Sequence, residues 1–131
     1  MMNLMSYIAC VSIMGQGTPR FAQDRFVIGF WVDPPADQTM ARRYQEIADA
    51  NFTLVLGGFG AATPETVARQ IALCQQHDLR AIVAMAGQKP DQLPDDPVVW
   101  GYLVRDEPGA AAFPELRATV DALRAARPNK L

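Results

Sequence analysis

The chain has 131 residues, of which half are apolar and a fifth are charged, and its formal net charge is -2. This length suits one compact domain with a hydrophobic core. The near-neutral charge argues against a nucleic acid or an anionic membrane surface as an electrostatic partner. Two cysteines, Cys10 and Cys74, are too few for a disulfide framework. No Cys/His spacing matches a zinc site, so neither a metal nor a cofactor is predicted.

The first 24 residues differ from the rest of the chain. An apolar run from Leu4 to Met14 has the length of a signal-peptide core and precedes Gly15 and Gly17, but no basic segment stands before it. Residues 1–24 are therefore predicted to be a secretory signal peptide or a disordered N-terminus, which implies a secreted or periplasmic protein. A misassigned start codon would make the protein cytoplasmic instead. The run is too short to cross a bilayer as a helix, so no membrane span is predicted.

The folded part is expected to begin at residue 25. An apolar run rich in β-branched and aromatic residues predicts a first strand over 26–32. Asp33-Pro34-Pro35 ends this strand, because proline has a fixed φ and no N–H for a sheet ladder. Asp37 is then expected to cap a helix over 37–50, whose apolar residues recur at helical spacing.

The next unit repeats this order. A strand is predicted over 52–56, followed by the turn Gly57-Gly58-Phe59-Gly60. That turn lacks the lysine and hydroxyl residue of a phosphate-binding loop, so we interpret its glycines as permitting a tight turn. Thr63-Pro64-Glu65 supplies an N-cap, a proline at the first helical position and an acid in the first turn, and predicts a helix over 64–77.

The second half of the chain continues the alternation. A third strand is predicted over 79–85, and residues 88–97, with three prolines, are predicted to form a loop or one short turn. The fourth strand, 98–104, ends just before two carboxylates and a proline. A last helix is predicted over 113–126, with Phe113, Leu116, Val120 and Leu123 as its buried stripe.

Sequential βαβ units imply parallel strands with right-handed crossovers. Two architectures fit: an open doubly wound sheet, or half of a closed barrel. The first βα turn lacks a glycine fingerprint, which argues against a dinucleotide-binding sheet. We therefore predict an α/β domain over 25–131, in which parallel βα repeats form the first half, about four strands, of a (β/α)₈ barrel that needs about 250 residues when complete.

The fourth strand and its continuation carry a resemblance. The run Trp100-Gly101-Tyr102-Leu103-Val104-Arg105-Asp106-Glu107-Pro108, with Phe113-Pro114-Glu115-Leu116 after it, resembles the middle of glycoside hydrolase-like TIM barrels, above all the β-galactosidase-like members of clan A. The resemblance covers residues 26–131. It implies a retaining O-glycosidase acting on carbohydrate, with Glu107 as the general acid/base. Asp106 takes the position of a family asparagine that contacts the sugar 2-hydroxyl.

The family's second carboxylate lies at the end of the seventh strand, which this sequence does not reach. The expectation is therefore an N-terminal fragment of a glycoside hydrolase that is inactive alone. Asp106 cannot supply the missing group, because consecutive strand residues point to opposite faces. Bound Mg²⁺ or Mn²⁺ at Asp106 and Glu107 is a weaker alternative, since two adjacent acids make a poor site.

Further substrate-binding candidates lie at the same strand ends. Trp31 offers a flat face on which a sugar can stack, and Asp33 a polar contact. Arg105 is expected to orient Glu107, and Phe59 is a weaker stacking candidate. Each has a structural alternative: core packing for the aromatic residues, a turn for Asp33 and a surface ion pair for Arg105.

A second class of function stays open at this point. A half barrel leaves the edges of its first and fourth strands unpaired, and such edges favour pairing with another chain. The alternative is therefore a non-catalytic carbohydrate-binding module, or a half-barrel that self-associates as a homodimer through these edges.

Overall fold

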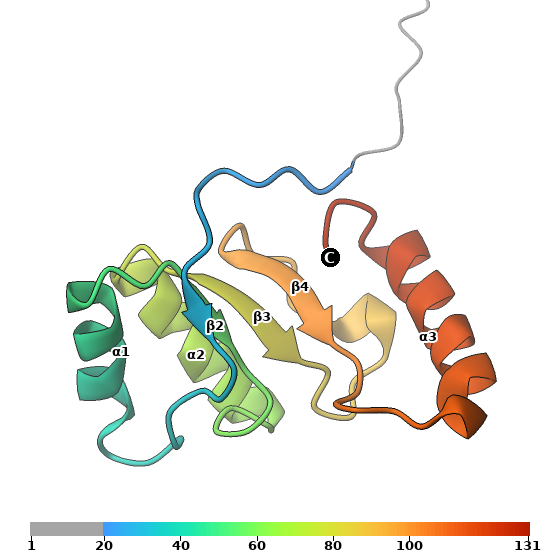
Figure 1. The fold of residues 1–131 in the computed structure, drawn as a ribbon, viewed down its shortest axis with the longest axis horizontal. Helices are drawn as coiled ribbons and strands as arrows, with labels where there is room; N and C mark the ends of the chain where they lie inside the picture. Colours follow the sequence, from blue (N-terminus) through green and yellow to red (C-terminus); the bar gives the residue numbers. More distant parts are fainter. Residues whose placement is uncertain (1–19) are drawn as a thin grey trace, which may run out of the picture.

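The computed structural model describes residues 20–131 as a four-stranded parallel sheet with helices packed around it (Figure 1). The elements are, in chain order, β1 (Gly29–Phe30), α1 (Met40–Asp49), β2 (Leu54–Leu56), α2 (Pro64–Gln76), β3 (Arg80–Ala84), the 3₁₀ turn η1 (Pro90–Gln92), β4 (Val99–Leu103), the 3₁₀ turn η2 (Ala110–Ala112) and α3 (Phe113–Ala126). The predicted α/β fold of parallel βα repeats is confirmed. The segment predicted as a signal peptide or disordered N-terminus falls, apart from residues 20–24, outside the described residues.

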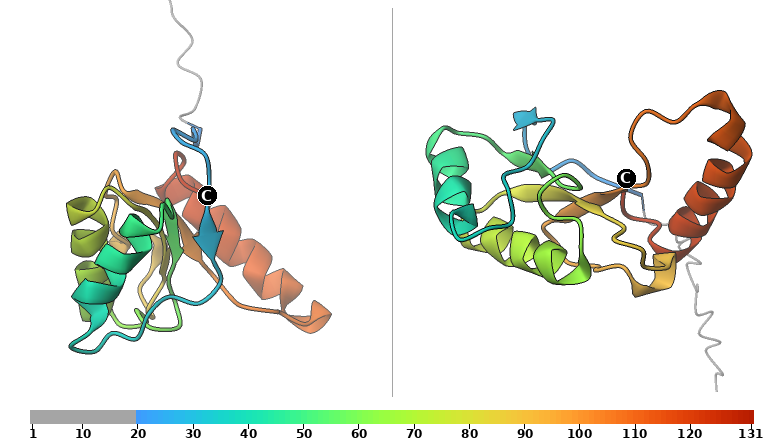
Figure 2. Two further views of the ribbon diagram at one scale, coloured as in Figure 1. Left: turned by 60° about the vertical axis from the view of Figure 1, so that its left-hand side comes forward. Right: turned by 90° about the horizontal axis from the view of Figure 1, so that it is seen from below.

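The strands lie in the order β1-β2-β3-β4, and every neighbouring pair is parallel. All carboxyl ends therefore meet at one edge of the sheet, the lower edge in Figure 1. Figures 1 and 2 show α1 and α2 on one face of the sheet and α3 standing beside β4. The loops that follow the strands are thus gathered at the edge where parallel α/β proteins bind ligands.

The first two strands and the first helix are shorter than predicted. β1 is confined to Gly29–Phe30 of the expected 26–32, and β2 to Leu54–Leu56 of the expected 52–56. Helix α1 begins at Met40 instead of residue 37. The Asp37 carboxylate accepts hydrogen bonds from the Thr39 N–H and hydroxyl, both at 2.7 Å, and forms a local turn ahead of the helix. The prediction that Asp37 caps the helix was therefore wrong.

The later helices follow their sequence signals closely. The Thr63 hydroxyl accepts from the Thr66 N–H at 3.3 Å, and Pro64 is the first residue of α2, as predicted. Helix α3 covers the predicted range from Phe113 to Ala126. Its stripe is less buried than expected: Leu123 is buried, but Phe113 is 56% exposed, because α3 contacts η1 and η2 more than the sheet.

The core lies between the sheet and helices α1 and α2. Its largest members are fully buried: Tyr44, Met40, Leu79, Leu93, Val55, Val67, Val83, Val99 and Cys74. Burial raises the pKa of the Cys74 thiol to about 12 and raises the pKa of the Tyr44 hydroxyl well above its usual value. Two polar residues share this interior, Gln70 and Asp33, and only Asp33 is held by several strong hydrogen bonds.

The outer edge of β4 is partly covered by the end of the chain. The Leu131 N–H donates to the Trp100 carbonyl at 2.7 Å, and the Leu131 carbonyl accepts from the Tyr102 N–H at 3.3 Å. Gly101 lies between these contacts, and a Cβ added there would come within 2.7 Å of the Leu131 Cβ. The expectation of a wholly open edge at β4 therefore needs correction. No strand lies outside β1 within residues 20–131.

Candidate functional site

Two exposed aromatic side chains lie together where β1 and β2 end. Trp31 directly follows β1 and is 59% exposed, while Phe59 follows β2 in the glycine-rich turn and is 41% exposed. Their ring centroids are 6.4 Å apart and their planes are inclined by 51°. Two large exposed rings in contact form a small apolar patch, which is more informative about a site than a single exposed apolar residue.

Asp33 explains why these two loops lie together. One carboxylate oxygen accepts from the Phe59 N–H at 3.0 Å and the Gly60 N–H at 2.8 Å, and the other accepts from the Ala61 N–H at 2.7 Å. The residue is 3% exposed. Hydrogen bonds to a charged acceptor contribute about 1.5–3 kcal/mol each, so this buried carboxylate ties the loop after β1 firmly to the loop after β2.

The glycines of the β2 loop are required by close approach. A Cβ added at Gly60 would stand 1.8 Å from the Pro34 carbonyl oxygen. Gly58 has a φ of +115°, and a Cβ there would lie 2.6 Å from a Leu103 side-chain carbon. The turn interpretation of these glycines therefore agrees with the structure, which adds that they let two neighbouring loops touch.

Beside the aromatic pair lies an open depression of about 330 Å³ at the ends of β2, β3 and β4. Its lining is Gly58, Phe59, Ala62, Ala84, Met85, Ala86, Gly87, Leu103, Val104, Arg105 and Asp106. Five of these eleven residues are glycine or alanine, and Arg105 and Asp106 are the two that carry charge. Phe59 belongs both to the depression and to the aromatic pair, so the two features form one continuous surface.

The residues after β4 are placed at the same edge. Arg105, Asp106 and Glu107 are all exposed, and Glu107 has a φ of +41°, which is rare for a residue other than glycine. Such conformations cost free energy and cluster at functional sites. Asp106 and Arg105 line the depression, whereas Glu107 is not part of its lining. Within residues 20–131 neither Arg105 nor Glu107 takes part in an ion pair, so no contact between them is observed.

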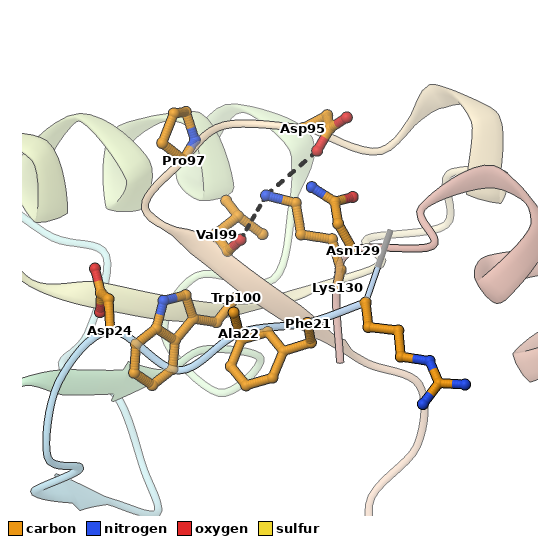
Figure 3. A pocket seen from close by; sticks show the side chains of 10 residues that line it. Phe21, Ala22, Asp24, Asp95, Pro97, Val99, Trp100, Asn129 and Lys130 are labelled. Atoms are coloured by element: carbon orange, nitrogen blue, oxygen red, sulfur yellow. Dashed lines mark hydrogen bonds and ion pairs between the residues drawn. The ribbon is translucent and has the colours of Figure 1, made fainter. Parts of the chain in front are cut away.

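A second cavity, of about 450 Å³, lies at the opposite, amino-terminal end of β4 (Figure 3). Here Phe21 packs edge-on against Trp100 with centroids 5.4 Å apart. Lys130 donates to the carbonyls of Asp96 and Val99, both at 2.8 Å, and pairs with Asp95 at 3.3 Å. The Lys130 ammonium group is therefore satisfied within the chain, and it holds the C-terminal segment against β4.

Two other kinds of feature, a metal centre and a membrane-spanning helix, are absent from residues 20–131. No group of three or more histidine, cysteine, aspartate or glutamate side chains lies together as a metal ion would need. Over the same residues, no helix has both the length and the apolar composition to cross a membrane.

The predicted site residues thus divide into three groups. Trp31 is exposed at the carboxyl edge of the sheet, and Asp33, two residues later, is buried. Asp106 and Arg105 line the depression, and Glu107 follows them in the chain. Phe59, the weaker stacking candidate, lies against Trp31 and lines the depression, and its place after a predicted strand at the same sheet edge is the sequence signal for it. Scans of the sequence against protein-family models find no match, and searches among curated proteins and solved structures find none either.

Proposed function

We propose that the rim formed by Trp31, Phe59 and the adjoining depression binds carbohydrate. One observation carries this proposal: the two exposed aromatic rings lie side by side at the carboxyl edge of a parallel sheet. Aromatic rings offer flat apolar faces against the C–H groups of a sugar. Binding sites combine such apolar area with a few polar groups that fix orientation. Asp106 and Arg105, which line the depression together with Phe59, would be those groups.

The charges of Asp106 and Arg105 complement the chemistry of a polyhydroxylated ligand. An ionised Asp106 accepts hydrogen bonds from sugar hydroxyls, and the Arg105 guanidinium donates hydrogen bonds to hydroxyl or ring oxygens. Both side chains are exposed, and within residues 20–131 neither forms an ion pair with another side chain. They are therefore free to exchange water for ligand hydroxyls at low cost.

The same proposal extends to hydrolysis through the resemblance of the β4 region to glycoside hydrolase barrels. Glu107 would protonate the glycosidic oxygen as the general acid. A retaining reaction also needs a second carboxylate about 5 Å away across the sugar. Asp33 does not supply it, because its oxygens are engaged by three backbone N–H groups below the rim. We therefore expect residues 1–131 to bind sugar without turnover, and the second carboxylate to come from a complementary half of the barrel.

A matched pair of variants tests the binding surface. Trp31→Ala removes a ring from the rim, whereas Phe26→Ala removes a more exposed ring, 79% exposed against 59%, ahead of the amino end of β1. In calorimetric titrations with a panel of neutral oligosaccharides, Trp31→Ala should weaken binding about tenfold or more, and Phe26→Ala should leave it unchanged. Absence of binding by the wild type, or an equal loss in both variants, would contradict the proposal.

A second candidate function is self-association with another copy of this chain. It is favoured by the outer edge of β1, which no strand of residues 20–131 covers and which is flanked by exposed apolar residues: Phe26, Val27, Ile28, Trp31 and Val32. Sedimentation velocity distinguishes the two candidates. A dimer that Ile28→Lys converts to a monomer, with sugar binding retained, would assign the β1 edge to assembly and the rim to ligand.

A further inference from the structure

We infer that Asp33 is a positioning residue, which holds Phe59 beside Trp31 so that the aromatic pair is formed before any ligand arrives. Its effect on sugar affinity rests on the proposed function. Its effect on the geometry of the two rings is independent of that function and can be measured without ligand.

The hydrogen bonds of Asp33 all go to one loop. Within the described residues its carboxylate contacts the consecutive N–H groups of Phe59, Gly60 and Ala61, and it pairs with no cation. Three successive amides pointing at one carboxylate fix the direction of the loop as well as its distance. The side chain therefore sets the backbone orientation from which the Phe59 ring projects.

The same residue controls the other ring through the chain. Trp31 stands two residues before Asp33, in the short segment between β1 and the first proline. The close approach of Gly60 to the Pro34 carbonyl leaves no space for the loops to slide past each other. The positions of both rings therefore depend on one group, the buried Asp33 carboxylate.

An anchor of this kind favours binding by removing an entropic cost. A ligand that covers two rings must otherwise immobilise the glycine-rich loop 57–60, and ordering mobile side chains and loops opposes association. Because Asp33 already holds this loop in the free protein, the entropy of ordering the loop is lost during folding and does not weaken ligand binding. Asp33 therefore acts on the ligand through Phe59, without touching it.

The two tryptophans provide separate reporters for the test. The Trp31 ring lies beside the Phe59 ring, with centroids 6.4 Å apart, and the Trp100 ring lies beside Phe21 at the far end of β4, with centroids 5.4 Å apart. In the ligand-free protein, Asp33→Asn should move the Trp31 indole resonance towards its position in Phe59→Leu and leave the Trp100 resonance in place. Asp37→Ala is the matched control, because Asp37 lies in the same loop but, within residues 20–131, its side chain bonds to Thr39 alone.

Each outcome decides the inference. A selective Trp31 shift in Asp33→Asn, absent from Asp37→Ala, supports it, and an oligosaccharide titration should then show an affinity loss of about tenfold. Unchanged Trp31 and Trp100 resonances, or equal shifts in both, would overturn it. If the wild type binds none of the sugars while the selective Trp31 shift is present, the proposed function fails and the positioning role stands.

Discussion

Gly60 lies so close to Pro34 that an added Cβ would stand 1.8 Å from the Pro34 carbonyl oxygen. This contact joins the loop after β1 to the loop after β2 at the point where the Gly60 N–H also donates to Asp33. The rim that carries Trp31 and Phe59 is therefore built by two loops locked together.

Gly60→Ala should consequently be among the most damaging single-methyl additions to this chain. The clash is with backbone atoms, so neither loop can relieve it by a rotamer change, and the expected loss of unfolding free energy is about 3 kcal/mol or more. Gly109→Ala is the control, because no heavy atom lies within 4 Å of a Cβ placed there and its φ is not positive. Urea unfolding measures both, and a change below about 1 kcal/mol in Gly60→Ala would contradict the packing described here.

Gly101→Ala should release the end of the chain from β4. The added methyl group would meet the Leu131 Cβ and carbonyl oxygen, both at 2.7 Å. Hydrogen exchange should then accelerate at the amides of Leu131 and Tyr102, which bond across this contact, while the amides between β2 and β3 keep their protection. Unchanged exchange at Leu131 would show that the tail contact does not persist in solution.

Acid should loosen the segment 20–25 before it unfolds the sheet. A hydrogen bond from Arg80 lowers the pKa of Asp24, and one from Arg25 lowers the pKa of Asp78. A carboxyl group with a lowered pKa in the folded state contributes stability above its ordinary value of 3.8 and loses it as the pH falls through the folded value. Both carboxylates are exposed, so the effect is small and sensitive to salt.

The Trp100 indole resonance reports this loosening, because Phe21 in the same segment packs against Trp100. Between neutral pH and about pH 3, the Trp100 signal should shift before the Trp31 signal does. In the double variant Asp24→Asn, Asp78→Asn the acid shift should be absent. A shift retained in that variant would assign the acid response to other groups.

Cys74 should be unreactive in the folded protein. It is fully buried, and its pKa of about 12 leaves almost no thiolate at neutral pH. In a Cys10→Ser background, which removes the other thiol, Cys74 should be alkylated only as fast as the protein unfolds. Rapid labelling under native conditions would mean that α2 opens locally from the sheet.

The elements with local sequence signals were predictable. Thr63 and Pro64 mark the start of α2 through a cap and a fixed φ, and Phe113–Ala126 forms the predicted α3. Asp37 was misread because a carboxylate ahead of a helix can close an Asx-type turn as readily as cap the helix. The short β1 could not be foreseen, because its pairing depends on contacts with β2, which lies more than 20 residues further along the chain.

The site was less accessible from the sequence, because its key contacts join residues far apart in the chain. The partners of Asp33 are backbone amides 26 to 28 residues away, and amides carry no residue-type signal. The pairing of Trp31 with Phe59 likewise follows from the register of β1 on β2. The sequence did predict that the residues after each strand share one edge of the sheet, because the carboxyl ends of sequential parallel strands lie together.

The most direct measurement is a titration of ¹⁵N-labelled protein with neutral oligosaccharides, followed by two-dimensional NMR. Sugar binding at the rim should shift the Trp31 indole N–H and the amides of Phe59 and Asp106, with the Trp100 indole unmoved. The absence of shifts with every sugar, or shifts centred on the Phe21–Trp100 cavity at the opposite end of β4, would contradict carbohydrate binding at this edge of the sheet.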